Sequence, residues 1–368
     1  MGGGKRGRLN RSPAPGYMSI LLYSIHCYRR GRKMNLKQFN LGVFVMIAAL
    51  LLSACGAQTS QTGGAQPVKL KIGYSVWVGY GPLFIARDKG YFKDEGLDIE
   101  LVKVEDPKDR FAALGGKQLD GLVTTLDTMT LYWRAESPFV AILGLDESSG
   151  GDGIIVRKAL NIASVKDLKG KKIGVNVGSV SHFLLDYLLQ QNGLSDADVT
   201  LVKMKQGDVP AALIAGQVDA GVTWEPHLSK AAKDPNLAIL TTSKETPGLI
   251  VDTLLLRRDV LSANQGIGTK LSRAWNKAVE YQKTTPDDAA AIMQRGLGGF
   301  YEKPDDIKAD LAGARLFDKA RNLEFFGGSG PGTAIGTTKF AIDLWTKQGQ
   351  ITTPLKTEEL VDGSFLEK

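Results

Sequence analysis

Hydrophobic and polar positions alternate in two similar halves between residues 68 and 252. Each half has the pattern strand, helix, strand, helix, strand, which is typical of α/β sheets built from parallel strands. The strands are predicted at Leu70–Ser75, Leu97–Val104, Gly121–Thr125, Lys172–Asn176, Val199–Lys205 and Ala220–Trp224, and the helices at Pro82–Lys89, Arg110–Leu114, Ser181–Asn192 and Val209–Ala215.

An internal repeat supports this division. The segment FAALGGKQLDGLVTT (111–125) aligns without a gap on PAALIAGQVDAGVTW (210–224), and Lys71-Ile72-Gly73 recurs as Lys172-Ile173-Gly174. Two such units predict two lobes with a crevice between them, where ligands bind beyond the carboxyl ends of the strands. We therefore expect an α/β fold of two lobes joined by a hinge.

Helical periodicity dominates after Asp252, and we assign this tail to the first lobe. Lobe 1 is expected to comprise residues 68–147 and 251–368, and lobe 2 residues 148–250. The tail helices are predicted at Lys270–Lys283, Asp287–Arg295, Asp305–Phe317 and Thr338–Gln348.

The net charge of +7 comes from the N-terminal segment. Residues 1–54 hold nine Lys or Arg and no Asp or Glu, so the other 37 basic and 39 acidic residues leave about −2. A globular part so close to neutral gives no reason to expect a nucleic-acid partner.

The order of features before Cys55 is typical of a lipoprotein signal peptide. Lys37 precedes the apolar run 41–52, and small residues lead to the cysteine in Leu52-Ser53-Ala54-Cys55. We expect residues 34–54 to be the signal, Cys55 to carry the lipid, and 55–67 to be a flexible tether. Residues 1–33 fit an upstream extension that does not belong to the native protein.

The candidate binding residues follow the predicted strands. Trp77, Tyr80 and Gly81 form an aromatic and glycine loop, while Ser179, Ser181 and His182 open the helix after strand 172–176. A helix N-terminus presents free N–H groups to an anionic or polar oxygen, although Ser there is also a common cap. The remaining candidates from these segments are Thr125, Asp127, Asp152, Trp224 and Glu225.

Three of these candidates, Asp127, Asp152 and Glu225, are acidic, and no Arg or Lys lies in a candidate loop. Because carboxylates repel a bare anion, we expect a ligand with a cationic or hydrogen-donating part. A taurine-like zwitterion fits, with its sulfonate at Ser179 and Ser181. A nitrogen heterocycle stacked on Trp77, Tyr80 or Trp224 fits nearly as well. The glycine-rich segment 148–153 is expected to be a hinge.

Catalysis has little support in the sequence. No P-loop, nucleophile elbow or dinucleotide fingerprint is present, and the chain after Cys55 has no cysteine and two separated histidines, His182 and His227. We therefore expect no enzyme activity, no cofactor and no metal.

These motifs, in this order, resemble the nitrate, sulfonate and taurine class of periplasmic-type binding proteins. The resemblance rests on Ile72-Gly73-Tyr74 with Trp77, Gly90-Tyr91-Phe92, 167–172, 178–182, and 218–220 leading to Trp224-Glu225-Pro226. It implies a type II Venus-flytrap fold, an ABC permease and ATPase as partners, and Asp252 facing the cleft.

We thus expect a monomeric, lipid-anchored binding protein on the extracytoplasmic face of the cell membrane that delivers a small polar solute to an importer. Two alternatives remain open. One is a pyrimidine-precursor protein of the thiamine pathway, either binding or enzymatic, because that class has the same fold. The other is a surface module that senses a ligand.

Overall fold

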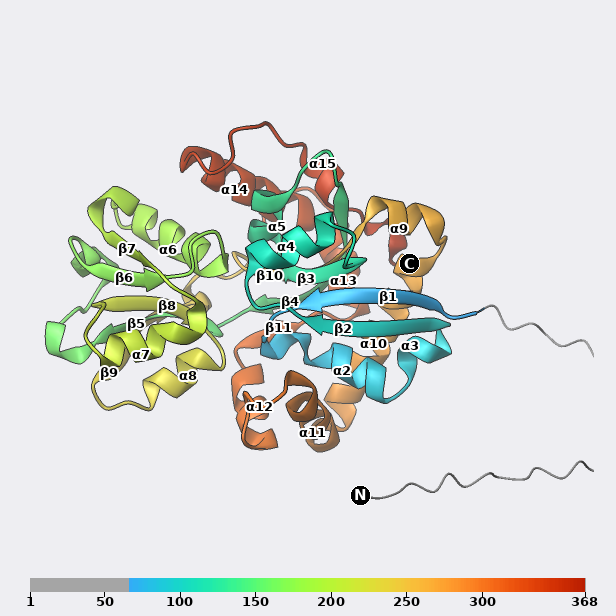
Figure 1. The fold of residues 1–368 in the computed structure, drawn as a ribbon, viewed down its shortest axis with the longest axis horizontal. Coiled ribbons are helices and arrows are strands. Elements are labelled where there is room, and N and C mark those ends of the chain that lie inside the picture. The colour runs from blue at the N-terminus through green and yellow to red at the C-terminus, as the bar shows by residue number, and fades with distance from the viewer. Residues whose placement is uncertain (1–65, 368) are drawn as a thin grey trace, which may run out of the picture. The chain divides into compact units, whose positions relative to one another are not determined.

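The computed structural model describes residues 66–367, which form two α/β lobes, each built on its own sheet (Figure 1). The predicted signal, the lipidation site at Cys55 and nearly all of the tether lie outside the described residues. Within the described part, no helix has both the length and the apolar character needed to cross a membrane.

The sheet of lobe 1 has the strand order β11-β4-β10-β3-β1-β2. Strand β1 pairs in parallel with β2 and β3, and β10 runs antiparallel between β3 and β4. The strands are β1 (Val68–Tyr74), β2 (Leu97–Lys103), β3 (Gly121–Thr125), β4 (Phe139–Ser148), β10 (Val251–Arg257) and β11 (Ala314–Leu316).

The sheet of lobe 2 repeats this plan in the order β7-β6-β8-β5-β9. Strand β6 is parallel to β7 and β8, and β5 is antiparallel to β8 and β9. The chain passes between the sheets after β4 and again before β10. The strands are β5 (Asp152–Arg157), β6 (Lys172–Val175), β7 (Thr200–Lys203), β8 (Ala220–Trp224) and β9 (Leu237–Thr242).

Helices cover both sheets. Local signals set several of their starts: Pro107 stands at the first position of α4, and the Asp106 side chain accepts from the Lys108 N–H at 2.9 Å. The helices are α2 (Gly81–Asp88), α3 (Tyr91–Asp94), α4 (Pro107–Gly115), α5 (Leu126–Tyr132), α6 (Val180–Gln191), α7 (Val209–Ile214), α8 (His227–Ala232), α9 (Arg258–Ala263), α10 (Ile267–Thr284), α11 (Pro286–Leu297), α12 (Pro304–Leu311), α13 (Lys319–Phe326), α14 (Ala334–Lys347) and α15 (Thr357–Leu360).

Helix α14 touches both lobes. Trp345 is fully buried, and its ring centroid lies 5.5 Å from that of Phe183 in α6 of lobe 2. Its indole N–H donates to the Asp127 carbonyl of lobe 1 at 3.0 Å. Helix α14 therefore ties the two lobes together beside the second crossing segment, whose Leu249 and Ile250 belong to the same apolar cluster.

The structure corrects three predictions. The sheets are mixed rather than parallel, because β10 and β5 run antiparallel to their neighbours. The residues after Asp252 first complete strand β10, so the helical tail begins later than expected. The helix predicted over 305–317 ends at Leu311, and β11 then pairs with the edge of β4.

Candidate functional site

A cavity lies between the lobes at the ends of the strands. The empty space among its lining atoms, including the part at its mouth that is open to solvent, is about 410 Å³. Both lobes contribute to its wall, as expected for a ligand site of this fold class. We call it the central cavity. It is lined by Ser75, Trp77, Tyr80, Glu105, Pro107, Arg110, Thr124, Thr125, Thr128, Asp152, Ser179, Val180, Trp224 and Asp252.

Seven of the twelve residues predicted for binding line the central cavity: Trp77, Tyr80, Thr125, Asp152, Ser179, Trp224 and Asp252. The other five, Gly81, Asp127, Ser181, His182 and Glu225, lie behind its wall or beside it.

The aromatic wall is held by close backbone packing. The Trp77 indole donates to Asp146 Oδ1 at 3.0 Å and is only 4% exposed. A Cβ at Gly79 would lie 2.2 Å from Asp146 Oδ2, and one at Gly151 would lie 2.3 Å from the Trp77 ring. Gly79 and Gly151 therefore leave the space in which Trp77 fits between the lobes.

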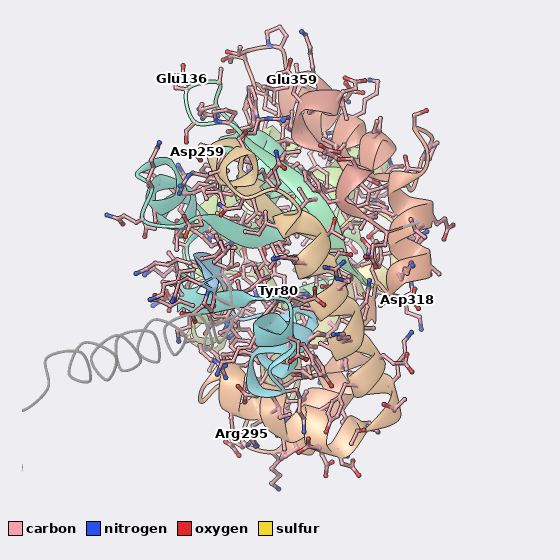
Figure 2. All side chains as sticks on the ribbon, turned by 90° about the vertical axis from the view of Figure 1, so that its right-hand side faces the viewer. Tyr80, Glu136, Asp259, Arg295, Asp318 and Glu359 are labelled. Carbon is pink, nitrogen blue, oxygen red and sulfur yellow. The ribbon has the colours of Figure 1, made fainter. Side chains whose placement is uncertain are left out.

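Tyr80 is buried near the middle of the molecule, whereas Glu136 and Arg295 lie at its periphery (Figure 2). Its hydroxyl donates to Asp252 Oδ1 in a short hydrogen bond. Gly81 begins α2 instead of facing the cavity. A Cβ there would lie 2.0 Å from Met293 in α11, so its glycine serves helix packing.

Buried aspartates from both lobes gather at the cavity. Asp146 and Asp252 are directly opposite each other on β4 and β10, and Asp152 begins β5. Burial raises the pKa of Asp146 to about 8 and of Asp152 to about 7, and it raises the pKa of Asp252 further above its usual range. Burial therefore disfavours the charged form of all three carboxylates in the ligand-free protein.

Asp127 lies behind Thr125 and Thr128 rather than in the cavity wall. Its Oδ2 accepts from the Thr128 hydroxyl at 3.0 Å, and burial raises its pKa to about 7. Among the described residues, Oδ1 has no hydrogen-bond partner. Asp127 thus acts on the cavity through Thr128 and through its charge.

The Ser179 side chain caps α6. Its hydroxyl donates to the Asn176 carbonyl at 2.7 Å and accepts from the Ser181 N–H at 3.2 Å. Ser181 is fully buried behind the cap, since successive residues of a helix point in different directions. A ligand at this end therefore meets the backbone of the first turn.

His182 belongs to a buried network behind this loop. Its Nδ1 accepts from the Gly178 N–H at 3.4 Å, and its Nε2 lies 3.1 Å from Asp196 and 3.5 Å from Asp186. Burial raises the pKa of Asp186 to about 9. His182 therefore positions the loop that carries Ser179 and does not itself line the cavity.

Glu225 lies where the lobes meet outside the cavity. Its Oε2 accepts from the Ser229 N–H at 2.9 Å, and the Ser229 hydroxyl lies 3.4 Å from Asp310 of lobe 1. Burial, and then the charge of Asp310, raise the pKa of Glu225 to about 7. Its position favours a role in lobe contact over direct binding.

Two residues of the site were missed by the sequence analysis. Arg110 lines the cavity from helix α4, outside the loops in which the sequence analysis looked for a cation. The signal was available, because Arg110 shares the buried face of its helix with Phe111 and Leu114. Asp146, which accepts the hydrogen bond of the Trp77 indole, was not singled out, although it is an acidic residue in an otherwise apolar run.

The arrangement of two mixed sheets with a ligand-sized cavity between them is that of the periplasmic binding proteins. The aliphatic sulphonate binding protein SsuA from Escherichia coli superposes with a TM-score of 0.64 at 20% identity, covering 80% of this chain and 97% of its own. The nitrate-binding protein NrtA from Synechocystis PCC 6803 gives 0.64 at 14% identity, covering 81% and 87%. These likenesses establish the fold.

Sequence comparison adds the family. Residues 77–289, more than half of the chain, match the model described as NMT1/THI5 like, and the chain belongs to this family. A Bacillus subtilis (strain 168) protein provisionally named an aliphatic sulfonates-binding protein is 27% identical over 89% of this chain and 96% of its own. The 4-amino-5-hydroxymethyl-2-methylpyrimidine phosphate synthase of Schizosaccharomyces pombe (strain 972) is 32% identical over 39% of this chain and 41% of its own.

Proposed function

We propose that the protein is the solute-binding component of an ABC importer and binds a small polar molecule that has a cationic or hydrogen-donating part. The observation that carries this proposal is the position of Asp152 and Asp252, which face one cavity from different lobes. A donor group that contacts both carboxylates stabilises the closed arrangement of the lobes, because only the closed form makes both contacts.

The cellular context is part of the same proposal. Cys55 would carry the lipid, the protein would act as a monomer on the extracytoplasmic face of the membrane, and a permease and an ATPase would take up the solute. Support comes from the lipoprotein-like order of residues 37–55 and from the aliphatic sulfonates-binding relative, which aligns over 89% of this chain.

Two solute classes fit the cavity wall. A taurine-like or other aliphatic sulfonate zwitterion would place its amine on the aspartates. A nitrogen heterocycle would stack on Trp77, Tyr80 or Trp224 and donate ring or amino N–H groups to the same carboxylates. Both offer a donor to these carboxylates, whereas a bare anion such as nitrate has none.

A thermal unfolding screen of the full-length chain in detergent tests the proposal. The panel contains taurine, alkanesulfonates, polyamines, pyrimidines, flavins, nitrate and bicarbonate. A solute that binds only the folded chain stabilises it by about 2.7 kcal/mol at a hundredfold excess over Kd. We expect amines or heterocycles to raise the midpoint and nitrate and bicarbonate to leave it unchanged.

Variants then locate the contact. We expect Asp152→Asn and Asp252→Asn each to weaken binding roughly 30- to 100-fold, the loss for a charged hydrogen bond. Glu136→Gln is the matched control, because it makes the same kind of change on an exposed carboxylate. Full affinity in both cavity variants would reject the carboxylate contact.

The partial match to a pyrimidine phosphate synthase supports a second candidate, a thiamine-precursor protein that binds or converts a pyrimidine. Mass spectrometry of the solute recovered after incubation tests the converting form of this candidate, since a binding protein returns the solute unchanged. A surface sensing module remains the third reading, and genes for a permease and an ATPase beside this one would favour the importer.

A further inference from the structure

Arg110 is a buried cation in the wall of the central cavity. Its side chain is 4% exposed, and its Nη1 donates to the carbonyls of Val104 at 2.6 Å and Glu105 at 3.4 Å. Within residues 66–367, its Nε has no hydrogen-bond partner and no carboxylate oxygen lies within the 4.0 Å of an ion pair. The hydrogen-bond partners of this guanidinium are therefore neutral groups.

A purely structural role accounts for only part of this arrangement. The two carbonyls engage Nη1 and would hold the loop after β2, and Gly73 leaves room for the stem of Arg110, since a Cβ there would lie 3.2 Å from Cγ. However, burial lowers the pKa of this guanidinium, and the carboxylates of Glu105, Asp106 and Asp252 oppose this effect only from beyond ion-pair distance. An anion in the cavity would supply the missing partner.

The opposite lobe presents a second positive feature. Helix α6 spans 12 residues, and its first turn, Ser179 and Val180, lines the same cavity. Its free N–H groups and dipole favour a negative group. Arg110 belongs to α4 of lobe 1 and α6 to lobe 2 (Figure 1), so an anion between them contacts both lobes.

We propose that Arg110 and the first turn of α6 form an anion subsite, and that the solute is amphoteric. Its acid group, a carboxylate, sulfonate or phosphate, lies between Arg110 and α6. Its amine or ring N–H contacts Asp152 and Asp252. This inference rests on the proposed function and narrows its solute class, because a simple amine leaves Arg110 unpaired and a simple anion leaves the aspartates unpaired.

Matched compounds test the subsite by calorimetry on the full-length chain. Taurine is compared with ethanolamine and ethanesulfonate, β-alanine with propylamine, and a carboxylated or phosphorylated pyrimidine with its uncharged parent. We expect wild-type protein to bind the amphoteric member of one set at least about 30-fold more tightly than either partial analogue, as a charge-assisted hydrogen bond predicts. The preferred set identifies the acid group.

Arg110→Met should weaken binding of the amphoteric compound roughly 30-fold and leave the acid-free analogue within about threefold, since only the acid contacts Arg110. If Arg110→Met misfolds, Arg110→Lys is used instead. Because it keeps the charge, it should recover part of the lost affinity for the amphoteric compound. Arg134→Met is the control, because this exposed arginine also donates to carbonyls, those of Leu131 and Trp133.

The outcomes separate the two proposals. Equal affinity for the acid-free and amphoteric compounds overturns the anion subsite and leaves the proposed function intact. Tight binding of the acid alone, with no effect of the amine, overturns the aspartate contact instead. Binding of no compound from any set overturns both.

Discussion

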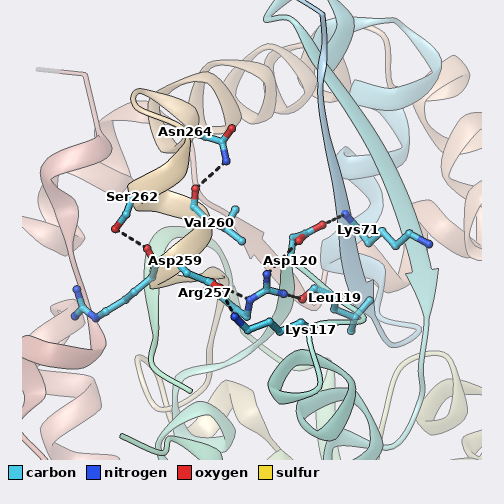
Figure 3. Close-up of polar contacts among 10 residues, drawn as sticks. Lys71, Lys117, Leu119, Asp120, Arg257, Asp259, Val260, Ser262 and Asn264 are labelled. Carbon is cyan, nitrogen blue, oxygen red and sulfur yellow. Dashed lines mark hydrogen bonds and ion pairs between the residues drawn. The ribbon is translucent and has the colours of Figure 1, made fainter. Parts of the chain in front are cut away.

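The two repeated segments, 111–125 and 210–224, build the same scaffold. Asp120 Oδ2 accepts the Lys71 N–H at 2.8 Å in lobe 1, and Asp219 Oδ2 accepts the Lys172 N–H at 2.9 Å in lobe 2. In addition, the Asp120 N–H donates to the Lys71 carbonyl and the Asp219 N–H donates to the Lys172 carbonyl, both at 2.8 Å. Figure 3 shows the lobe 1 copy, in which Asp120 also faces Arg257.

The repeats differ where they approach the cavity. Arg110 precedes the first segment and lines the cavity, whereas its counterpart Val209 is fully buried and packs on the sheet of lobe 2. Thr125 ends the first segment, and the larger Trp224 ends the second. Residues shared by the repeats therefore hold the fold, and residues that differ between them shape the site.

The largest expected effect concerns the acidic cavity, which has no equivalent in the shared scaffold. The pKa of Asp152 is raised from 3.8 to about 7, so the native state keeps a proton that the unfolded chain releases. Stability of the ligand-free protein should therefore fall as pH rises from about 4 to about 7, by up to ~4 kcal/mol for this group. Urea unfolding at a series of pH values measures the slope.

Asp152→Asn should flatten this dependence and stabilise the protein near pH 8, because it removes the carboxylate that burial disfavours. Glu136→Gln provides the control for a change of charge on the surface. If the slope of stability against pH is unchanged in Asp152→Asn, this carboxylate is ionised in the folded protein and holds no proton in the cavity.

The scaffold was more predictable than the site for a physical reason. Strand and helix periods leave a local signal, and the internal repeat showed where each lobe begins. Strand β11 is only three residues long and depends on pairing with β4, so no local period marks it. Likewise, Ser181 lies beside Ser179 in sequence but points away from the cavity because α6 begins between them.

The missed residues show the same limit. Loops after strands were searched for ligand-binding residues, and Trp77 and Tyr80 were selected in this way, whereas Asp252 came from the family resemblance. Arg110 reaches the cavity from a helix face. Asp146, inside a strand and opposite Asp252, holds the cavity residue Trp77 without lining the cavity itself. Both positions depend on contacts between elements distant in sequence. A charged residue at a buried position of a repeat is the signal that would have found Arg110.

An intermediate effect tests whether the scaffold is shared. Asp120→Ala and Asp219→Ala each remove the acceptor of one strand N–H, and each should lower the free energy of unfolding by about 2 kcal/mol. Asp120→Ala also removes the ion pair with Arg257, which adds at most about 1 kcal/mol to the loss in lobe 1. Solute affinity should stay unchanged, since neither residue lines the cavity. Chemical unfolding measures both losses. Asp98→Ala, at an exposed strand position, is the control. Losses that differ by more than ~1 kcal/mol would contradict equivalence of the repeats.

The smallest expected effect concerns Trp224, which takes the place of Thr125 in the second repeat. Its indole N–H crosses between the lobes and donates to the Val76 carbonyl at 3.0 Å. Trp224→Phe keeps an aromatic wall and removes this bond, so closure should lose about 1 kcal/mol and solute dissociation should become about fivefold faster. Stopped-flow dissociation of the bound solute measures this rate.

Trp133→Phe is the matched control, because Trp133 donates the same kind of bond to the Phe139 carbonyl at 3.2 Å within lobe 1. It should leave dissociation unchanged while lowering stability by a similar amount. If both variants accelerate dissociation equally, the effect is general loosening of the protein. If only Trp224→Phe does so, the exchange of Thr125 for a tryptophan in the second repeat serves lobe closure, and divergence of the repeats accounts for the moving part of the site as well as for its charge.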